Sequence, residues 1–164
     1  MSLIWKPSVT VATIVHREED GKFLLIEEET SDGIRINQPA GHLDPHESLE
    51  QAVIRETLEE AAYDFHPTAL VGMYMSRYTS RRTGEEVTYL RFTFCGTPGK
   101  QHTGRPLDEG ILRAMWLTRD ELAACRDQHR SPLVLQCVDE YLAGRRAPLE
   151  LLHTHASVYK EAIA

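Results

Sequence analysis

The chain has 164 residues, of which 41% are hydrophobic and 26% are charged, and it contains ten glycines and eight prolines. This composition is typical of one globular domain and excludes a disordered chain or a fibre, and a chain of this length buries enough surface to fold without a disulfide or a structural zinc ion. The net charge of −7 excludes general electrostatic attraction to nucleic acid or to anionic lipid.

The N-terminal part of the chain predicts a hairpin followed by a short strand. Residues 8–16 are rich in β-branched side chains and residues 22–29 contain an apolar run, and the acidic-glycine break at 19–21 predicts the turn between them. Residues 34–38 form a third extended segment, which Pro39 ends.

Residues 48–62 form the clearest predicted helix. Ser48 is a good N-cap, and Gln51 lies three residues further on, so that the two complete a capping box. The helix carries an apolar face that can pack on a sheet and a second face rich in acids.

Two further strands are predicted at 70–78 and 87–95, joined by a polar turn. Residues 96–110 are rich in Gly and Pro and are expected to form a loop, and residues 111–117 are expected to form another strand. Thr118 then caps a short helix.

The last predicted helix begins at Ser131-Pro132, runs to about Leu142 and ends at Gly144. Strands therefore dominate, and two or three helices interrupt them. The order of elements predicts an α+β domain, with a mixed β-sheet between helices in an α/β/α sandwich.

The negative charge is concentrated in residues 41–64, which contain seven acids and one base, so that this segment alone carries −6. At about 100° per residue, Glu56, Glu59 and Glu60 share one face of the predicted helix. Because like charges at this spacing destabilise a helix, we expect a cation there. Ligands that offer only oxygen favour Mg²⁺ or Mn²⁺ over zinc. The alternative is an ordinary solvated acidic face.

The residues before the helix favour the metal site. Residues 39–45 form a rigid turn in which Gly41 lets the backbone approach a ligand. Gly41, five residues, Glu47, seven residues and then Arg55-Glu56-Thr57-Leu58-Glu59-Glu60 together resemble the Nudix box, GX5EX7REUXEEXGU with U aliphatic. Six of its seven fixed residues are present.

The chain departs from that pattern at three positions. Ala62 stands where the last Gly of the box belongs, and the aliphatic positions hold Thr57 and Tyr63. Alanine in a left-handed helix cap is unfavourable, so we expect the end of the helix to be remodelled or prolonged.

The resemblance to Nudix hydrolases implies roles for the box residues. Glu56 and Glu60 would be the main metal ligands, Glu59 would join them or orient a water molecule, and the Gly41 carbonyl would complete the shell. A pair formed by Glu47 and Arg55 would fix the loop to the helix. The resemblance covers residues 8–152 and also implies the family's α/β/α fold. It further implies activity on nucleoside tri- and diphosphates or on hydroxymethylpyrimidine diphosphate.

Further residues are candidates for the chemistry and for substrate contact. Glu59 is the first choice of general base. The resemblance implies Asp108 and Glu109, in the loop just before the 111–117 strand, as alternatives for a base or an extra ligand, although a solvated loop acid is the simpler interpretation of both. Arg91 alternates with apolar neighbours on its strand and is a candidate for a phosphate contact or for a salt bridge.

Amide, basic and histidine side chains complete the candidates. The amides of Asn37 and Gln38 are candidates for reading a base edge, although a turn role for Asn37 fits as well. His42 and His46 flank the box loop, where they could contact phosphate or pack the loop. A zinc site at His153 and His155 is rejected because no third ligand is evident. The arginines of the polar hairpin turn are too few to indicate nucleic acid binding.

The sequence gives no sign of a membrane or an oxidising compartment. No apolar run approaches the roughly 20 residues of a membrane span, and residues 1–7 lack the layout of a signal peptide. Three cysteines that never form CxxC indicate reduced thiols, most simply small buried hydrophobes. We therefore expect a cytoplasmic single domain over residues 1–164, with a tail at 153–164, that acts as a monomer or a homodimer.

The sequence therefore predicts a Mg²⁺- or Mn²⁺-dependent phosphohydrolase of small nucleotide or pyrimidine diphosphates, in which water attacks phosphorus. Two other functions remain open. One is an RNA 5′-pyrophosphohydrolase, which only the basic hairpin supports. The other is a non-catalytic sensor of a nucleotide metabolite on the same fold.

Overall fold

The structure is a computed structural model, and it describes residues 4–159. The predicted C-terminal tail, residues 153–164, therefore lies partly outside the described residues. The elements follow in the order β1 (Ser8–Arg17), β2 (Lys22–Thr30), β3 (Gly33–Asn37), β4 (Ala40–His42), α1 (Leu49–Ala61), β5 (Tyr63–Thr79), β6 (Glu86–Gln101), β7 (Ile111–Thr118), α2 (Arg119–Ala124) and α3 (Leu133–Leu142). Short 3₁₀ turns occupy Arg126–Gln128, Leu149–Leu151 and Ala156–Val158.

The strands form a mixed sheet in the order β3-β2-β1-β6-β5, with β4 paired to β1 and β7 paired to β2. The β1 and β6 strands run parallel, and all the other pairs are antiparallel. The pairing of β1 with β2 is limited to His16↔Phe23 and Arg17↔Lys22. Beyond these pairs, β1 lies with β4 and β6 while β2 lies with β3 and β7, so the sheet divides into two parts.

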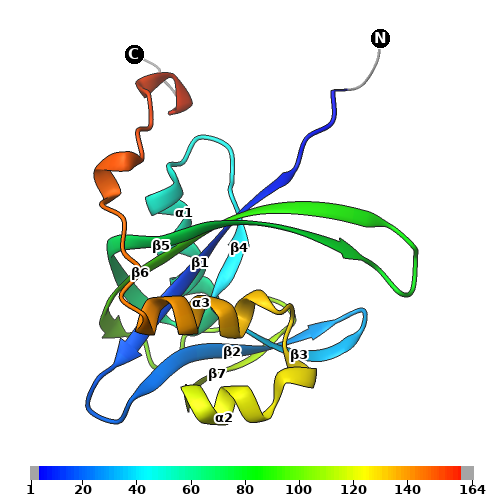
Figure 1. Cartoon of the computed structure of the whole chain (residues 1–164). Coiled ribbons are helices and arrows are strands. Elements are labelled where there is room, and N and C mark those ends of the chain that lie inside the picture. The colour runs from blue at the N-terminus through cyan, green and yellow to red at the C-terminus, as the bar shows by residue number, and fades with distance from the viewer. Residues whose placement is uncertain (1–3, 160–164) are drawn as a thin grey trace.

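Helices cover both faces of the sheet, as predicted, and each face has its own core. The run Phe23-Leu24-Leu25-Ile26 on β2 is fully buried because alternate side chains enter opposite cores. Phe23 and Leu25 pack with α2 and α3, while Leu24 and Ile26 pack with α1. In Figure 1, α3 lies in front of the strands. None of the described helices is long and apolar enough to span a membrane.

The predicted loop at 96–110 is wrong over its first six residues, because β6 continues to Gln101 and pairs with a β5 that begins at Tyr63. Gly96 serves close strand contact there: a Cβ at this position would lie 2.1 Å from the His66 carbonyl oxygen. Register shifts in the pairing, one of them beside Phe65↔Pro98, accommodate the proline. The Gly and Pro content therefore marked an irregular strand pair.

Both ends of α1 have defined caps. The predicted capping box is confirmed: Ser48 accepts from the Gln51 N–H, and Gln51 accepts from the Ser48 N–H. At the other end Ala62 has φ 57° and ψ 33°, a left-handed cap whose N–H donates to Leu58 O. The expectation of a remodelled or prolonged end is therefore wrong, because Ala62 adopts the left-handed cap that the motif's glycine would favour.

Candidate functional site

A pocket of about 740 Å³ lies between the two parts of the sheet, where β1 and β2 no longer pair. Thr10 of β1 and Asn37 of β3 belong to opposite parts, and both line it. The β5–β6 hairpin, the segment just before α3 and Leu133 at the start of that helix complete the wall. Figure 1 shows this hairpin reaching past the core on the same side as the β2–β3 hairpin.

Three carboxylates gather at the exposed edge of α1. Oxygens of Glu56, Glu59 and Asp108 lie within 4.8 Å of one another, and the Asp108 N–H donates to Glu59 O at 3.0 Å, which ties the loop before β7 to the helix. A set of carboxylate oxygens with graded exposure, from buried Glu56 to exposed Asp108, fits a hard divalent cation that keeps other positions for water or substrate. Of the two loop acids proposed from the sequence, Asp108 joins this cluster, and exposed Glu109 does not.

Gly41 lies in β4 opposite Val11, directly against the carboxyl group of Glu56. A Cβ on Gly41 would lie 2.1 Å from Glu56 Cδ. Glycine is thus needed there to make room for the carboxylate, and β4 forms inside what the sequence predicted as a turn.

Glu60 faces the pocket from one turn beyond Glu56, and only 8% of it is exposed. Its Oε2 accepts a hydrogen bond from the Ala40 N–H at 2.8 Å. Burial raises the pKa of Glu60 to about 9, and the nearby carboxylates of Glu56, Glu28 and Asp108 add to the rise against the Ala40 hydrogen bond. Burial likewise raises the pKa of Glu56, against the lowering effect of Arg55. Burial thus disfavours the charged forms of Glu56 and Glu60, a cost that a bound cation would offset.

Arg55 joins the box loop to the helix, as the sequence proposed for the pair with Glu47. Its Nε and Nη2 donate to the two oxygens of Glu47 at 3.0 and 2.7 Å, and Nη2 also donates to His42 O at 3.0 Å. Its Nη1 donates to Glu56 at 2.7 Å and to Glu59 at 3.0 Å. The guanidinium fork thereby orients three carboxylates at once. Burial raises the pKa of Glu47, but the hydrogen bonds from Arg55 and from the Asp44 N–H outweigh burial and hold this pKa below its ordinary value.

Arg91 lies in the pocket wall with only 7% of its surface exposed. Its Nη2 donates to Gln38 Oε1 at 2.6 Å and its Nη1 donates to Asn37 Oδ1 at 3.4 Å. Among the described residues it makes no salt bridge, and its Nε is buried without a partner. Burial lowers the pKa of the guanidinium, so the charge is held at a cost that a bound anion would offset.

The structure brings Arg91, Asn37 and Gln38 into one network. Gln38 is fully buried, and its Nε2 donates to Val134 O of α3 at 2.7 Å. Gln38 thus lies behind Arg91 and holds it against α3. Asn37 lines the pocket, with its amide oxygen toward Arg91.

The other candidates are more scattered. His42 lines the pocket with its ring 6.2 Å from that of Tyr89, whereas His46 lies on the box loop with its Nδ1 3.1 Å from Val158 O. Arg81 and Arg82 are exposed at the tip of the β5–β6 hairpin.

Several pocket residues were not singled out from the sequence. Tyr89 and Ser76 lie on the same faces of β6 and β5 as Arg91 and Tyr74, so the strand alternation that placed Arg91 could have found them. Glu28 carried no such signal, because the apolar run before it is buried on both faces.

A model of the NUDIX domain family matches residues 6–137. Phosphatase NudJ of Escherichia coli (strain K12) is 34% identical over 149 residues, which cover 91% of this chain and 92% of that protein.

Solved structures agree in fold. A NUDIX hydrolase from Nitrosomonas europaea superposes with a TM-score of 0.83 and 46% identity, covering 92% of this chain and 98% of that one. A MutT protein from Methanosarcina mazei Go1 shares the fold, with a TM-score of 0.67 and 20% identity over 88% of this chain and all of that one.

Proposed function

This chain belongs to the Nudix hydrolase family, and from that premise we propose that it is a divalent-cation-dependent phosphohydrolase of nucleoside tri- and diphosphates or of hydroxymethylpyrimidine diphosphate. The observation that carries the proposal is the meeting, in one pocket, of acids from the Nudix box with a buried arginine that pairs with no carboxylate of residues 4–159. The resemblance to phosphatase NudJ supports the choice of substrates.

The box acids are assigned to the cation. Glu56, Glu59 and Asp108 present the clustered oxygens. Glu60, the second main ligand expected from the motif, lies outside this cluster, and together with the Gly41 carbonyl it is assigned to the remaining positions of the shell. When bound, Mg²⁺ or Mn²⁺ supplies charge neutralisation for phosphate oxygens and makes water more acidic. Without that neutralisation, a pocket with this many acids would repel a diphosphate.

The remaining residues position the reacting groups. Arg55 holds three carboxylates in a fixed fork, and Glu47 holds Arg55 in turn. Arg91 donates to the phosphate end of the substrate, backed by Gln38 and Asn37. Glu59, half-buried and next to Arg55, is the first choice to accept the proton of the attacking water, with Asp108 as the alternative.

Phosphate release tests the proposal. Nucleoside di- and triphosphates, hydroxymethylpyrimidine diphosphate, a nucleotide sugar and 5′-triphosphorylated RNA are offered with Mg²⁺, with Mn²⁺ and with EDTA. We expect cation-dependent release from the small compounds. Release from the RNA alone would favour the RNA 5′-pyrophosphohydrolase, and tight binding without turnover would favour a sensor.

Two adjacent acids give a matched pair of variants. Asp108→Asn removes the negative charge and one carboxylate oxygen from the cluster, and we expect kcat/KM to fall at least about 100-fold. Glu109→Gln changes the neighbouring exposed acid, which lies outside the cluster, and should stay within about twofold of the parent. Equal effects of the two substitutions on kcat/KM would contradict the assignment of Asp108 as a ligand of the cation.

Glu60→Gln tests whether Glu60 on α1 takes part in the cation site. Because Glu60 makes no ion pair within the described residues and is buried, the amide should not lower the free energy of unfolding of the metal-free protein, whereas turnover should be lost. Near-normal phosphate release from a folded Glu60→Gln protein would remove Glu60 from the site.

A further inference from the structure

Glu28 is an acid in the pocket wall that lies outside the carboxylate cluster. Its Oε1 accepts from Asn37 Nδ2 at 3.4 Å and lies 3.7 Å from Arg130 Nε, both at the long end of such contacts. Among the described residues, no hydrogen bond reaches Oε2. The side chain is 20% exposed and Oε2 is not among the fully buried atoms that lack a partner, so this oxygen is available to a molecule in the pocket.

A loosely paired carboxylate is unfavourable beside a phosphate. Arg130 compensates its charge only in part at 3.7 Å, and the cluster that would hold cations does not include it. The Asn37 amide lies between Glu28 and Arg91, because its nitrogen donates to Glu28 and its oxygen accepts from Arg91. Glu28 thus borders the phosphate contact, and it fits a neighbouring N–H group on the organic part of a phosphorylated substrate.

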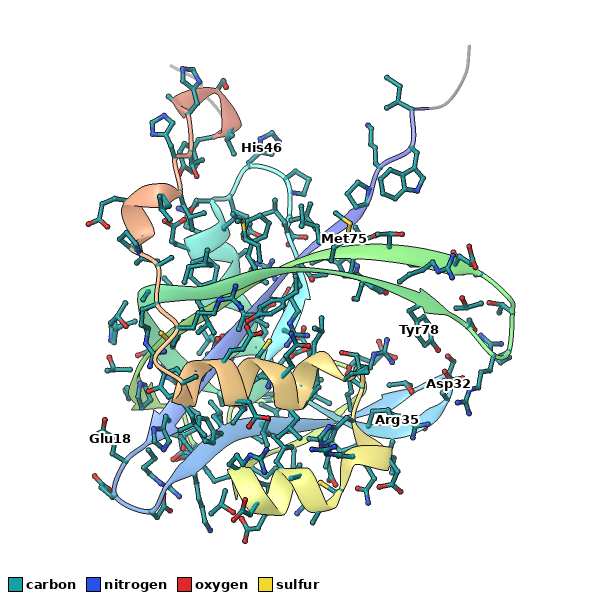
Figure 2. The ribbon with its side chains drawn as sticks, viewed as in Figure 1. Glu18, Asp32, Arg35, His46, Met75 and Tyr78 are labelled. Carbon is teal, nitrogen blue, oxygen red and sulfur yellow. The ribbon has the colours of Figure 1, made fainter. Side chains whose placement is uncertain are left out.

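An aromatic ring and a guanidinium line the pocket close to Glu28. The Arg130 guanidinium lies 5.8 Å from the centre of the Tyr78 ring, and both residues line the pocket. The Tyr78 hydroxyl donates to Asp32 in the turn between β2 and β3, which holds the ring in place. Figure 2 shows Tyr78 and Asp32 facing each other from the two hairpins. The guanidinium lies over the ring, and a planar cation held in this way is suited to stacking on a flat heterocycle.

We propose that Glu28 is a specificity-determining residue that accepts a hydrogen bond from an amino group on the planar heterocycle of the substrate. The inference rests on the proposed function and deepens it. Nucleoside diphosphates whose base carries an exocyclic amine, such as CDP and ADP, are preferred over UDP and IDP, whose bases carry a carbonyl oxygen at that position. A carbonyl oxygen in place of the amine would face the Glu28 carboxylate with two acceptors and no proton between them.

The test compares matched pairs that differ at this group. Values of kcat/KM for CDP against UDP and for ADP against IDP are measured with Mg²⁺ for the parent, Glu28→Gln and Glu29→Gln. The parent should prefer the amino member of each pair about tenfold to a hundredfold. An amide can donate as well as accept, so Glu28→Gln should reduce the preference to within about threefold, mainly by improving the carbonyl member.

Glu29→Gln is the control, because Glu29 is the next acid on β2, is exposed and does not line the pocket. It should keep the parent's preference. Glu28→Asp keeps the charge but shortens the side chain by one methylene, so it should also lose the preference for the amino member. This variant replaces Glu28→Gln in the test if Glu28→Gln fails to fold.

Binding separates this inference from the hydrolase function. Calorimetry of CMP against UMP and of AMP against IMP, with Mg²⁺, reports the preference without turnover. Preferential binding that depends on Glu28, together with absent phosphate release, would overturn the hydrolase and leave the inference standing. A parent that does not distinguish the members in binding or turnover would overturn the inference, as would a Glu28→Gln protein that keeps the preference.

Discussion

At Gly41 a missing side chain makes room for the carboxyl group of Glu56. The same pair appears in the sequence as two fixed positions of a motif, fifteen residues apart. Their contact explains why the first position needs glycine although its φ is not positive, since the requirement is space beside the carboxylate and not a left-handed backbone.

Gly41→Ala should therefore damage the site directly. The added methyl cannot fit unless Glu56 or β4 moves, so we expect a loss of about 1–3 kcal/mol in the free energy of unfolding and at least about a 100-fold fall in kcat/KM. Gly84→Ala, in the left-handed turn at the hairpin tip with no atom within 4 Å of its Cβ, should cost about 1–2 kcal/mol and leave kcat/KM unchanged. Denaturant unfolding and phosphate release measure the two effects. An active Gly41→Ala enzyme would show that the Glu56 carboxylate can be displaced without consequence.

At the scale of one element, α1 combines a favourable start with a strained end. The capping box at Ser48 satisfies two N–H groups, whereas Ala62 holds a left-handed conformation that L residues other than glycine seldom adopt. The end stays where it is because β5 begins one residue later and because the Ala62 carbonyl accepts a hydrogen bond from the His102 N–H at 2.8 Å. Tertiary contacts thus impose the cap that glycine would favour on its own.

Ala62→Gly should raise the free energy of unfolding by about 0.5–1 kcal/mol. Relief of the left-handed strain exceeds the loss of one methyl group and the greater freedom of glycine in the unfolded chain. Chemical denaturation of the two proteins measures it, and kcat/KM should not change. A less stable Ala62→Gly protein would mean that packing of the methyl outweighs the backbone strain.

The segment before α3 gives a pH dependence. His129 Nε2 lies 2.9 Å from Leu122 O, and burial lowers the pKa of His129 despite that contact. Its charged form is thus disfavoured in the folded state. The stabilisation of the fold by the uncharged side chain is therefore present above the unfolded pKa of about 6.5, and it is lost as pH falls below that value through the lowered folded pKa. The free energy of unfolding of His129→Gln should fall less between pH 7.5 and pH 5.5 than that of the parent. An equal fall in both proteins would remove His129 from the acid sensitivity.

At the scale of the whole molecule, the pocket exists because β1 leaves β2 after two residue pairs. Elements far apart in sequence then face one space: the box acids on α1, Arg91 on β6, Glu28 on β2 and the segment before α3 that holds Arg130. Gln38 links Arg91 to α3 through the Val134 carbonyl, so the position of the helix and that of the arginine are coupled. The acids, in contrast, are fixed within one helix and two loops.

Cation binding should be visible in the stability of the whole fold. A cation that binds the folded state at a hundred times its dissociation constant adds about 2.7 kcal/mol, which corresponds to a rise in Tm of several degrees for a chain of this size. We expect Mg²⁺ or Mn²⁺ to raise Tm in thermal scans, EDTA to reverse the rise, and Asp108→Asn to reduce it. Glu109→Gln should respond as the parent does. A Tm that neither cation changes would contradict the assignment of the acidic cluster.

Much of this molecule follows from its sequence alone. Local signals act over a few residues, so the capping box of α1, the first hairpin and the shared face of Glu56, Glu59 and Glu60 could be predicted, and the motif that contains them indicated the family. Where glycine and proline served contacts between strands, as at Gly96, the local signal predicted a loop and failed. The sequence also could not reveal that Glu56 and Glu60 are buried.

Only the tertiary structure decided which distant residues share the pocket. Asp108 and Glu109 are adjacent acids that the sequence gives no reason to rank. The hydrogen bond from the Asp108 N–H to Glu59 O brings Asp108, and not Glu109, into the carboxylate cluster. Glu28 and Arg130 are about a hundred residues apart and became neighbours through the divergence of the two sheet parts. The reason is physical: helix periodicity and caps depend on adjacent residues, whereas the wall of a pocket depends on how sheets pair and separate.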